Sequence, residues 1–264
     1  MNNSIIESEV EKLSKKALID AANIALKYKN QKKKVCYKSE SQPVTQADLE
    51  IDNFLKDYFK IKTPNYGWIS EESKDDGSRY KRDFFWCLDP IDGTRSFIND
   101  KPEYTISLAL IKKNIPVLGF IVNPETNEFF FAKKGGGAFC NEIKLNVGKK
   151  NKIQLCKYAI SSSEEKKLSN FGVFEKNNIV KMGSIAYKIA LVAKGDFDIA
   201  LSFTKKNDWD VAAADLILNE AGGELRDLKG GKLVYNSTNL KIPSVVASNP
   251  YLQNEMNKIF SYNS

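Results

Sequence analysis

The sequence of 264 residues contains no histidine. This absence excludes Ser-His-Asp and Cys-His catalysis, phosphohistidine chemistry and every metal site that uses an imidazole ligand. Any bound metal would therefore be held by oxygen atoms, which favours a hard cation such as Mg²⁺ or Mn²⁺.

Cysteine is also scarce, and its four positions lie far apart with no Cys-x-x-Cys pair, at Cys36, Cys87, Cys140 and Cys156. This spacing provides no zinc site, and we expect free thiols rather than disulfides. No apolar run approaches the length that spans a bilayer, and the first residues lack the basic-then-apolar order of a secretion signal. We therefore expect a cytoplasmic protein that has no membrane partner.

Acidic residues are outnumbered, because 33 Asp and Glu face 40 Lys and Arg and leave a net charge of +7. Lysine clusters at residues 32–34, 112–113 and 149–150 are typical of solvated surfaces. The alternative is attraction of an anionic substrate or of nucleic acid. Because no basic motif is interleaved with aromatic residues, the sequence disfavours nucleic acid as a partner.

The apolar pattern changes from helical to strand-like along the first half of the chain. Apolar residues at helical spacing predict a long helix over residues 4–29. Thr45 is the predicted N-cap of a second helix, in which Asp48 would complete a capping box. Strand patterns between residues 84 and 139, broken by turn-like segments, predict an antiparallel meander. The glycines at residues 135–137 predict a turn, since no Gly-Lys-Ser/Thr helix start follows them.

A charged stretch at residues 148–152 is the predicted boundary between an N-terminal half, 1–150, and a C-terminal half, 151–264. Beyond this boundary we expect strands at 158–161, 198–201, 224–228 and 244–247, and helices at 184–194, 209–221 and 251–260. Such alternation is typical of an α/β protein.

The most informative motif is residues 88–97, where Asp89 and Asp92 follow an apolar stretch that predicts a buried strand. Gly93 and Thr94 can open a helix whose first amides point outward. Two carboxylates beside free amides suit a cation and a phosphate bound together. The competing interpretation is a strand followed by a capped helix, with Asp92 or Thr94 as the N-cap.

Other acidic segments favour the metal interpretation. Glu71 ends a short apolar run, and Asp210 lies at the start of a helix of small residues. Taken singly, Asp48 and Asp210 also suit helix caps. Clustered carboxylates repel one another unless cations neutralise them, so four acids in one site require metal.

These motifs, in this order, resemble the inositol monophosphatase superfamily of metal-dependent, lithium-sensitive phosphomonoesterases. The resemblance covers nearly the whole chain and implies a hydrolase with an alternating αβαβα layered sandwich, an α/β (α+β) fold, and an active site where the halves meet. The matching segments are Val44-Thr45-Gln46-Ala47-Asp48, Glu71-Glu72, Asp89-Pro90-Ile91-Asp92-Gly93-Thr94, Trp209-Asp210-Val211-Ala212-Ala213-Ala214, and the glycine-rich segments 135–137 and 222–223.

The resemblance also implies a ligand set for two or three Mg²⁺ ions, for which Mn²⁺ could substitute. Glu71, Asp89 and the Ile91 carbonyl would hold one metal. Asp89, Asp92 and Asp210 would hold the second. Two metals about 4 Å apart can activate a water and stabilise the leaving oxygen.

The catalytic residues implied by the same resemblance are Asp48, Thr94 and Glu71. Asp48 and Thr94 would orient the attacking water, and the amides of Gly93 and Thr94 would bind the phosphate. Helix N-terminal amides stabilise negative charge at such a position.

Two positions separate the branches of the family. Inositol monophosphatases usually carry a small polar residue after Asp-Gly-Thr and an acid seven positions before the Trp-Asp aspartate, whereas this chain has Arg95 and Phe203. This pattern resembles the 3'(2'),5'-bisphosphate nucleotidase branch and favours adenosine 3',5'-bisphosphate, a small anionic phosphate ester, as substrate. The predicted substrate-binding residues are Asp92, Gly93, Thr94, Arg95, Gly183, Ser184, Phe203 and Lys205.

Other functions stay open at this point. The alternatives are inositol-1-monophosphatase, histidinol-phosphate phosphatase, fructose-1,6-bisphosphatase, and a non-catalytic family member associated with RNA or transcription. Inositol monophosphatases tend to be dimers and bisphosphate nucleotidases are often monomers, so a homodimer is compatible with the resemblance.

Overall fold

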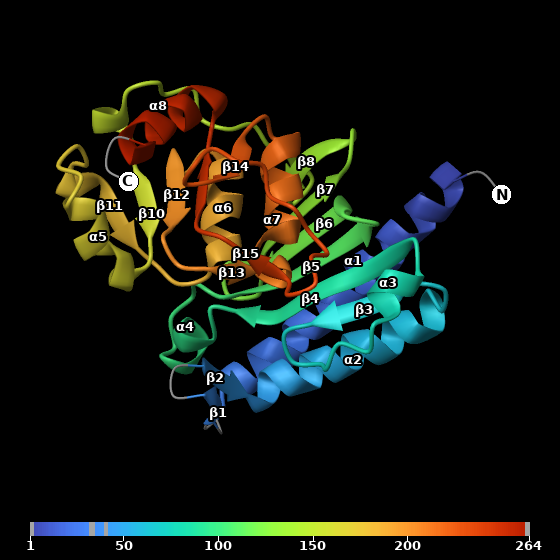
Figure 1. Ribbon diagram of the computed structural model, residues 1–264. Helices are drawn as coiled ribbons and strands as arrows, with labels where there is room; N and C mark the ends of the chain where they lie inside the picture. The colour runs from blue at the N-terminus through green and yellow to red at the C-terminus, as the bar shows by residue number, and fades with distance from the viewer. Residues whose placement is uncertain (1–2, 32–34, 40–41, 262–264) are drawn as a thin grey trace.

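The computed structural model describes residues 3–31, 35–39 and 42–261. Its first layer consists of two long helices, α1 (Asn3–Lys29) and α2 (Gln46–Lys62), which cover one face of a large sheet (Figure 1). Alternate residues of the strand at 84–92, Trp86 and Leu88, point toward these helices and pack with Leu18, Ile51 and Phe59. Since successive strand residues face opposite sides, Phe85 and Cys87 are left for the other face.

The second layer is a seven-stranded sheet built from residues 67–144. Only the β3–β4 pair is parallel, and the rest of the order β3-β4-β5-β6-β7-β8-β9 is antiparallel. The strands are β3 (Gly67–Ser70), β4 (Phe84–Asp92), β5 (Thr105–Lys112), β6 (Ile115–Asn123), β7 (Glu128–Lys133), β8 (Gly137–Cys140) and β9 (Ile143–Lys144). The predicted antiparallel meander is thus confirmed.

The middle layer is formed by α6 (Ile185–Lys194) and α7 (Asp208–Glu220), which lie between the two main sheets (Figure 1). The small residues of α7 allow close packing on β6. A Cβ atom at Gly119 would lie 2.7 Å from the Ala213 carbonyl oxygen, so only glycine fits there. This close contact fixes α7, and with it Asp210, relative to the seven-stranded sheet.

The fourth layer is a five-stranded sheet with the order β11-β10-β12-β16-β14. The chain forms it from β10 (Tyr158–Ile160), β11 (Ile179–Lys181), β12 (Ile199–Ser202), β14 (Glu224–Asp227) and β16 (Val245–Ser248). Its outer face is covered by α5 (Glu165–Ser169) and α8 (Pro250–Ser261), through Leu168, Leu252, Met256 and Phe260. Helices and sheets therefore alternate in five layers, and the predicted αβαβα sandwich is confirmed.

Several short elements were not predicted. A hairpin of β1 (Val35–Ser39) and β2 (Gln42–Thr45) precedes α2. Three others, α5, β9 and β11, belong to the layers described above. The rest are α3 (Ser78–Lys81), α4 (Thr94–Ile98), β13 (Lys206–Asn207), β15 (Lys241–Ile242) and the 3₁₀ turns η1 (Ile153–Leu155), η2 (Ser162–Glu164) and η3 (Lys176–Asn178); of these, only the start of α4 was predicted, at Thr94. Across the described ranges, no helix combines the length and apolar character that crossing a membrane requires.

Candidate active site

The candidate site is centred on the end of β4, where the strand carries two buried aspartates. Asp89 pairs with Ser107 of β5 and Asp92 pairs with Thr105, so three steps along β4 match two along β5. Such a bulge re-aims side chains at a strand end. Asp89 Oδ1 accepts a hydrogen bond from the Ile91 amide at 3.1 Å, which stabilises the turn around Pro90.

Gly93 joins β4 to the short helix α4. Its φ of 94° lies in the left-handed region, which glycine adopts without strain. A Cβ atom there would also lie 2.8 Å from the Glu103 carbonyl oxygen and 3.1 Å from the Ser184 amide nitrogen. Thr94 follows, and its hydroxyl donates to the Ile91 carbonyl at 3.0 Å. The sequence therefore places a glycine at a point where the two halves of the chain approach closely.

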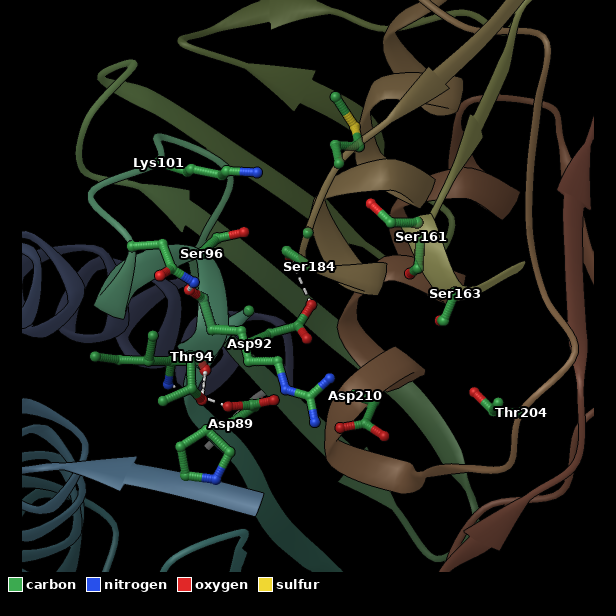
Figure 2. Close-up of a pocket in the computed structure, with 18 of the residues that line it drawn as sticks. Asp89, Asp92, Thr94, Ser96, Lys101, Ser161, Ser163, Ser184, Thr204 and Asp210 are labelled. Atoms are coloured by element: carbon green, nitrogen blue, oxygen red, sulfur yellow. Dashed lines mark hydrogen bonds between the residues drawn. The ribbon is translucent and has the colours of Figure 1, made fainter. Parts of the chain in front are cut away.

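Asp92 is tied to the C-terminal half. Its Oδ2 accepts hydrogen bonds from the Ser184 hydroxyl at 2.6 Å and from the Ala186 amide at 2.7 Å, at the start of α6 (Figure 2). Ser184 is also the N-cap of α6, because its hydroxyl accepts from the Tyr187 amide at 3.0 Å. Ser184 was predicted to bind substrate, and in the structure it holds Asp92 in place.

Asp48 and Asp210 both lie in the first turn of a helix. The predicted capping box is confirmed, since the Thr45 amide donates to Asp48 Oδ2 at 2.8 Å. Asp210 Oδ2 accepts in the same way from the Asn207 amide at 2.7 Å. Burial raises the pKa of Asp48 to about 6, and the hydrogen bonds from Thr45 oppose that effect.

Three carboxylates converge to form a cluster. Each of Glu71, Asp89 and Asp210 places an oxygen within 4.8 Å of an oxygen of the other two. Burial raises the pKa of Asp89 well above its usual value, and the charge of Glu71 raises it further. Burial, followed by repulsion from Asp92, raises the pKa of Asp210 to about 7. An all-oxygen, mutually repelling set of this kind fits a hard divalent cation, whose charge removes the repulsion.

A cleft of about 500 Å³ opens above this cluster, between the two halves of the chain. Figure 2 shows Asp89, Asp92, Thr94, Ser96 and Lys101 on one wall, and Ser161, Ser163, Thr204 and Asp210 on the other. Of the predicted residues, those that line the cleft are Glu71, Asp89, Ile91, Asp92, Gly93, Thr94, Arg95, Gly183, Ser184 and Asp210. Asp48 is buried and is not among the residues that line the cleft.

Two predicted substrate residues are placed elsewhere. Neither Phe203 nor Lys205 is among the residues that line the cleft. The ring of Phe203 stacks on Phe171 at 5.9 Å between centroids and meets the edge of Phe260 at 5.8 Å. It therefore belongs to the apolar layer outside the five-stranded sheet, which corrects the expectation that it faces the substrate.

Several cleft residues were missed by the sequence analysis. Lys101 and Lys181 line the cleft, as Arg95 does, and Glu164 lies in the C-terminal wall. Lys206, which the sequence offered beside Lys205 as a side chain that could reach an anion, also lines the cleft. Lys188 of α6 does not line the cleft but is 1% exposed and donates to the Ser161 hydroxyl at 2.6 Å. A lysine inside an otherwise apolar helix, after Ala186 and Tyr187 and before Ile189 and Ala190, was the available signal.

The layered fold and the carboxylate cluster define an α/β protein with a candidate cation site at the junction of its halves. Residues 6–262 match the sequence profile described as the inositol monophosphatase family. The chain therefore belongs to the inositol monophosphatase family, whose members are generally magnesium-dependent phosphatases.

Individual relatives carry different names. An inositol monophosphatase of Dictyostelium discoideum is 31% identical over 247 residues, with 88% of this chain and 87% of the relative covered. A 3'(2'),5'-bisphosphate nucleotidase CysQ of Haemophilus influenzae is also 31% identical, over 209 residues, with 75% and 77% covered. Among solved structures, the extragenic suppressor protein suhB of Bartonella henselae matches with a TM-score of 0.84 at 24% identity, covering 97% of this chain and 100% of that one. That structural match supports the fold alone.

Proposed function

We propose that this protein is a magnesium-dependent phosphomonoesterase that acts on a small substrate with a second anionic group, as a 3'(2'),5'-bisphosphate nucleotidase does. The observation that carries this proposal is the charge distribution of the cleft. The carboxylates of Glu71, Asp89 and Asp210 converge, and four basic side chains line the same cleft, namely Arg95, Lys101, Lys181 and Lys206.

The balance of charges favours a polyanion. Two divalent cations would neutralise the four carboxylates of Glu71, Asp89, Asp92 and Asp210, and the basic residues would then give the cleft a net positive charge. A positively lined cleft concentrates anions and binds phosphate through charge-assisted hydrogen bonds. A nucleoside bisphosphate would place one phosphate at the metal site and the second against the basic rim, by which we mean the side chains of Arg95, Lys101, Lys181 and Lys206.

The proposed mechanism assigns each side chain near the metals a separate task. When bound, the metals would supply an activated water and a charge that stabilises the leaving oxygen. Glu71, Asp89 and the Ile91 carbonyl would hold one ion, and Asp89, Asp92 and Asp210 the other. Thr94 Oγ1 and the Asp48 carboxylate would orient the water, and Glu71 would accept its proton.

Phosphate binding completes the proposed mechanism. The amides of Gly93 and Thr94 would hold the scissile phosphate at the end of β4. Because Gly93 adopts a positive φ without a side chain, the backbone can approach the phosphate closely. The two halves, 1–150 and 151–264, would each contribute one wall of the cleft.

A substrate panel tests the proposal directly. Phosphate release is measured from adenosine 3',5'-bisphosphate, inositol 1-phosphate, histidinol phosphate and fructose 1,6-bisphosphate, with Mg²⁺ and with excess EDTA. We expect Mg²⁺-dependent release with the highest kcat/KM for adenosine 3',5'-bisphosphate. A higher value for inositol 1-phosphate would overturn the substrate assignment, and full activity in EDTA would overturn the metal mechanism.

The role of the basic rim is tested by Arg95→Ala. If Arg95 binds the second phosphate, the variant should lose about tenfold in kcat/KM for adenosine 3',5'-bisphosphate, or ~1.4 kcal/mol. It should change little for inositol 1-phosphate, which has no second phosphate. Arg82→Ala, which removes an exposed arginine outside the cleft, is the matched control. An equal loss on both substrates would contradict the assignment.

Lithium inhibition is a further property that we propose from family membership. Li⁺ would replace the metal held by Asp92 and Asp210, so inhibition should depend on the Mg²⁺ concentration and weaken in Asp210→Asn. Initial rates in LiCl are compared with rates in NaCl at equal ionic strength. An unchanged rate across a LiCl titration would remove this part of the proposal.

Inositol 1-phosphate is the second candidate substrate, and one observation favours it. Glu164 supplies a carboxylate to the cleft wall, and carboxylates accept hydrogen bonds from the hydroxyl groups of a polyol. A non-catalytic role makes a different prediction, namely salt-sensitive RNA binding without Mg²⁺-dependent phosphate release. The same purified protein serves for both measurements.

A further inference from the structure

Glu164 has a buried carboxylate that is only half satisfied. The residue ends the 3₁₀ turn η2 and is 2% exposed, yet it lies in the cleft wall. Its Oε1 accepts hydrogen bonds from the Ser202 hydroxyl at 2.7 Å and from the Phe203 amide at 2.8 Å. Its Oε2 is buried and has no hydrogen-bond partner among the described residues. Leaving a buried carboxylate oxygen unpaired is costly, which indicates that a ligand completes the site.

The anchoring of Glu164 argues against a merely structural role for the free oxygen. Two donors at the end of β12 already hold Oε1, so the orientation of the carboxylate is set without Oε2. Ser202 and Thr204 hydroxyls lie 3.1 Å apart, and Lys206 donates to the Thr204 hydroxyl at 2.8 Å. This chain of polar contacts runs from Glu164 toward the cleft, because Thr204 and Lys206 also line it.

Lys188 lies close enough to Glu164 to interact with it electrostatically. Burial lowers the pKa of Lys188 to about 8, and the charges of Glu164 and Asp92 oppose that effect. The ammonium group has one hydrogen-bond partner among the described residues, the Ser161 hydroxyl. Lys188 itself is not among the residues that line the cleft, so of these two side chains only Glu164 offers a free acceptor in the C-terminal wall.

The free carboxylate oxygen selects the chemistry of the ligand group. A second phosphate at this position would meet the Glu164 carboxylate, and like charges repel. A hydroxyl group is neutral and can donate a hydrogen bond to the free oxygen. The basic side chains of the cleft, Arg95, Lys101, Lys181 and Lys206, are then left for a second phosphate.

We propose that Glu164 is a specificity-determining residue whose free carboxylate oxygen accepts a hydrogen bond from a hydroxyl of the substrate's alcohol portion. The proposal rests on the proposed phosphatase function and deepens it. The substrate class is a phosphate ester of a sugar or polyol, in which a hydroxyl neighbours the esterified carbon. In adenosine 3',5'-bisphosphate this group is the ribose 2'-hydroxyl.

The test compares two substrates that differ by one hydroxyl, adenosine 3',5'-bisphosphate and its 2'-deoxy analogue. We expect the wild-type protein to prefer the ribonucleotide by roughly tenfold to a hundredfold in kcat/KM, as a hydrogen bond to a charged group provides. Glu164→Gln keeps an oxygen for Ser202 and Phe203 but presents an amide donor in place of the free acceptor. The variant should lose activity on the ribonucleotide alone, which narrows the preference to about threefold or less.

Glu175→Gln is the matched control, because it removes one carboxylate of the same half that is exposed and outside the cleft. It should keep the wild-type preference, and a thermal melt of each variant establishes that it is folded. A folded Glu164→Gln protein that keeps the full ribonucleotide preference would overturn the proposal, as would a wild-type protein without any preference.

The failure of the proposed substrate can be told apart from the failure of this inference. If neither bisphosphate is hydrolysed, the bisphosphate assignment is wrong, and the same variants are compared on inositol 1-phosphate and cyclohexyl phosphate. A loss in Glu164→Gln on inositol 1-phosphate alone supports the hydroxyl contact. An equal effect on both esters, or no effect on either, overturns it.

Discussion

Asp89 is the carboxylate on which the proposed metal site depends most. It is 2% exposed, and the charges of Glu71, Asp92, Asp210 and Asp48 all act on its pKa. Asp89→Asn keeps the side-chain volume and the hydrogen bond from the Ile91 amide, but it removes the charge that would hold both cations. We expect kcat/KM to fall by about a thousandfold or more, since metal ions contribute several kcal/mol to such reactions.

The measurement for Asp89→Asn is phosphate release on the best substrate of the panel, beside the binding of Mg²⁺ by calorimetry. Asp83→Asn is its control, because Asp83 is exposed and lies just before β4. Near-normal turnover of Asp89→Asn together with weakened binding of Mg²⁺ would show that the cluster binds metal without using it in catalysis.

The residues that sequence reasoning identified share one property, which is that their positions follow from local signals. Asp89 and Asp92 end an apolar strand, and Asp48 and Asp210 stand in the first turn of predicted helices. Glu164 carries no such signal, because tertiary packing of η2 against the end of β12 decides its burial. The predicted environment of Phe203 was wrong because tertiary packing decides it as well. Its ring packs against Phe171 and Phe260, which lie far from it in the sequence.

At the scale of elements, the start of α6 links the two halves of the chain through Asp92. Ser184 both caps the helix and donates to Asp92, and its hydroxyl also lies 3.1 Å from the Thr105 hydroxyl, so Ser184→Ala removes three hydrogen bonds with one hydroxyl. Loss of the cap alone should lower the free energy of unfolding by about 1 kcal/mol. The freed Asp92 should also bind the second cation less tightly, so we expect a higher Mg²⁺ concentration for half-maximal activity.

These two effects of Ser184→Ala are separated by chemical denaturation and by an activity titration with Mg²⁺. Ser163→Ala offers a comparison, since Ser163 lines the cleft but is the N-cap of neither η2 nor α5. A variant that loses stability but keeps the wild-type Mg²⁺ dependence would limit Ser184 to capping.

The long elements and their order could be predicted from the sequence, and the junction between them could not. In α1, α2 and the meander, apolar residues recur at the spacing that places them on one face of the element. A short window of the sequence is enough to show this pattern. The approach of α6 to α4 depends on Gly183, where a Cβ atom would lie 2.9 Å from the Glu103 carbonyl oxygen. Asp92 and Ser184 are about ninety residues apart in the sequence and meet at this junction. No local sequence pattern predicts such a contact.

For the whole molecule, the layered fold places four acidic side chains at the junction of the seven-stranded sheet with α6 and α7. Burial raises the pKa of Asp210 at this junction to about 7, and that of Asp48 on α2 to about 6, in the absence of metal. Between their ordinary pKa values and these raised values, the folded chain holds protons that the unfolded chain has released. The free energy of unfolding of the metal-free protein should therefore fall as the pH rises from about 4 to about 7.

Bound Mg²⁺ should reverse that trend, because the cation replaces the protons as the neutralising charge. At about pH 6 protons compete with Mg²⁺ for Asp210, whereas at about pH 8 the carboxylates are free to bind it. We expect Mg²⁺ well above its dissociation constant to raise the Tm by about 5–10 °C near pH 8, as ~2.7 kcal/mol of ligand stabilisation provides, and by less near pH 6. Thermal melts with Mg²⁺ and with EDTA at both pH values measure the difference.

Asp89→Asn should abolish the Mg²⁺-dependent rise in Tm, while Asp83→Asn should retain it. An equal rise in both variants would place the stabilising cation outside the cleft.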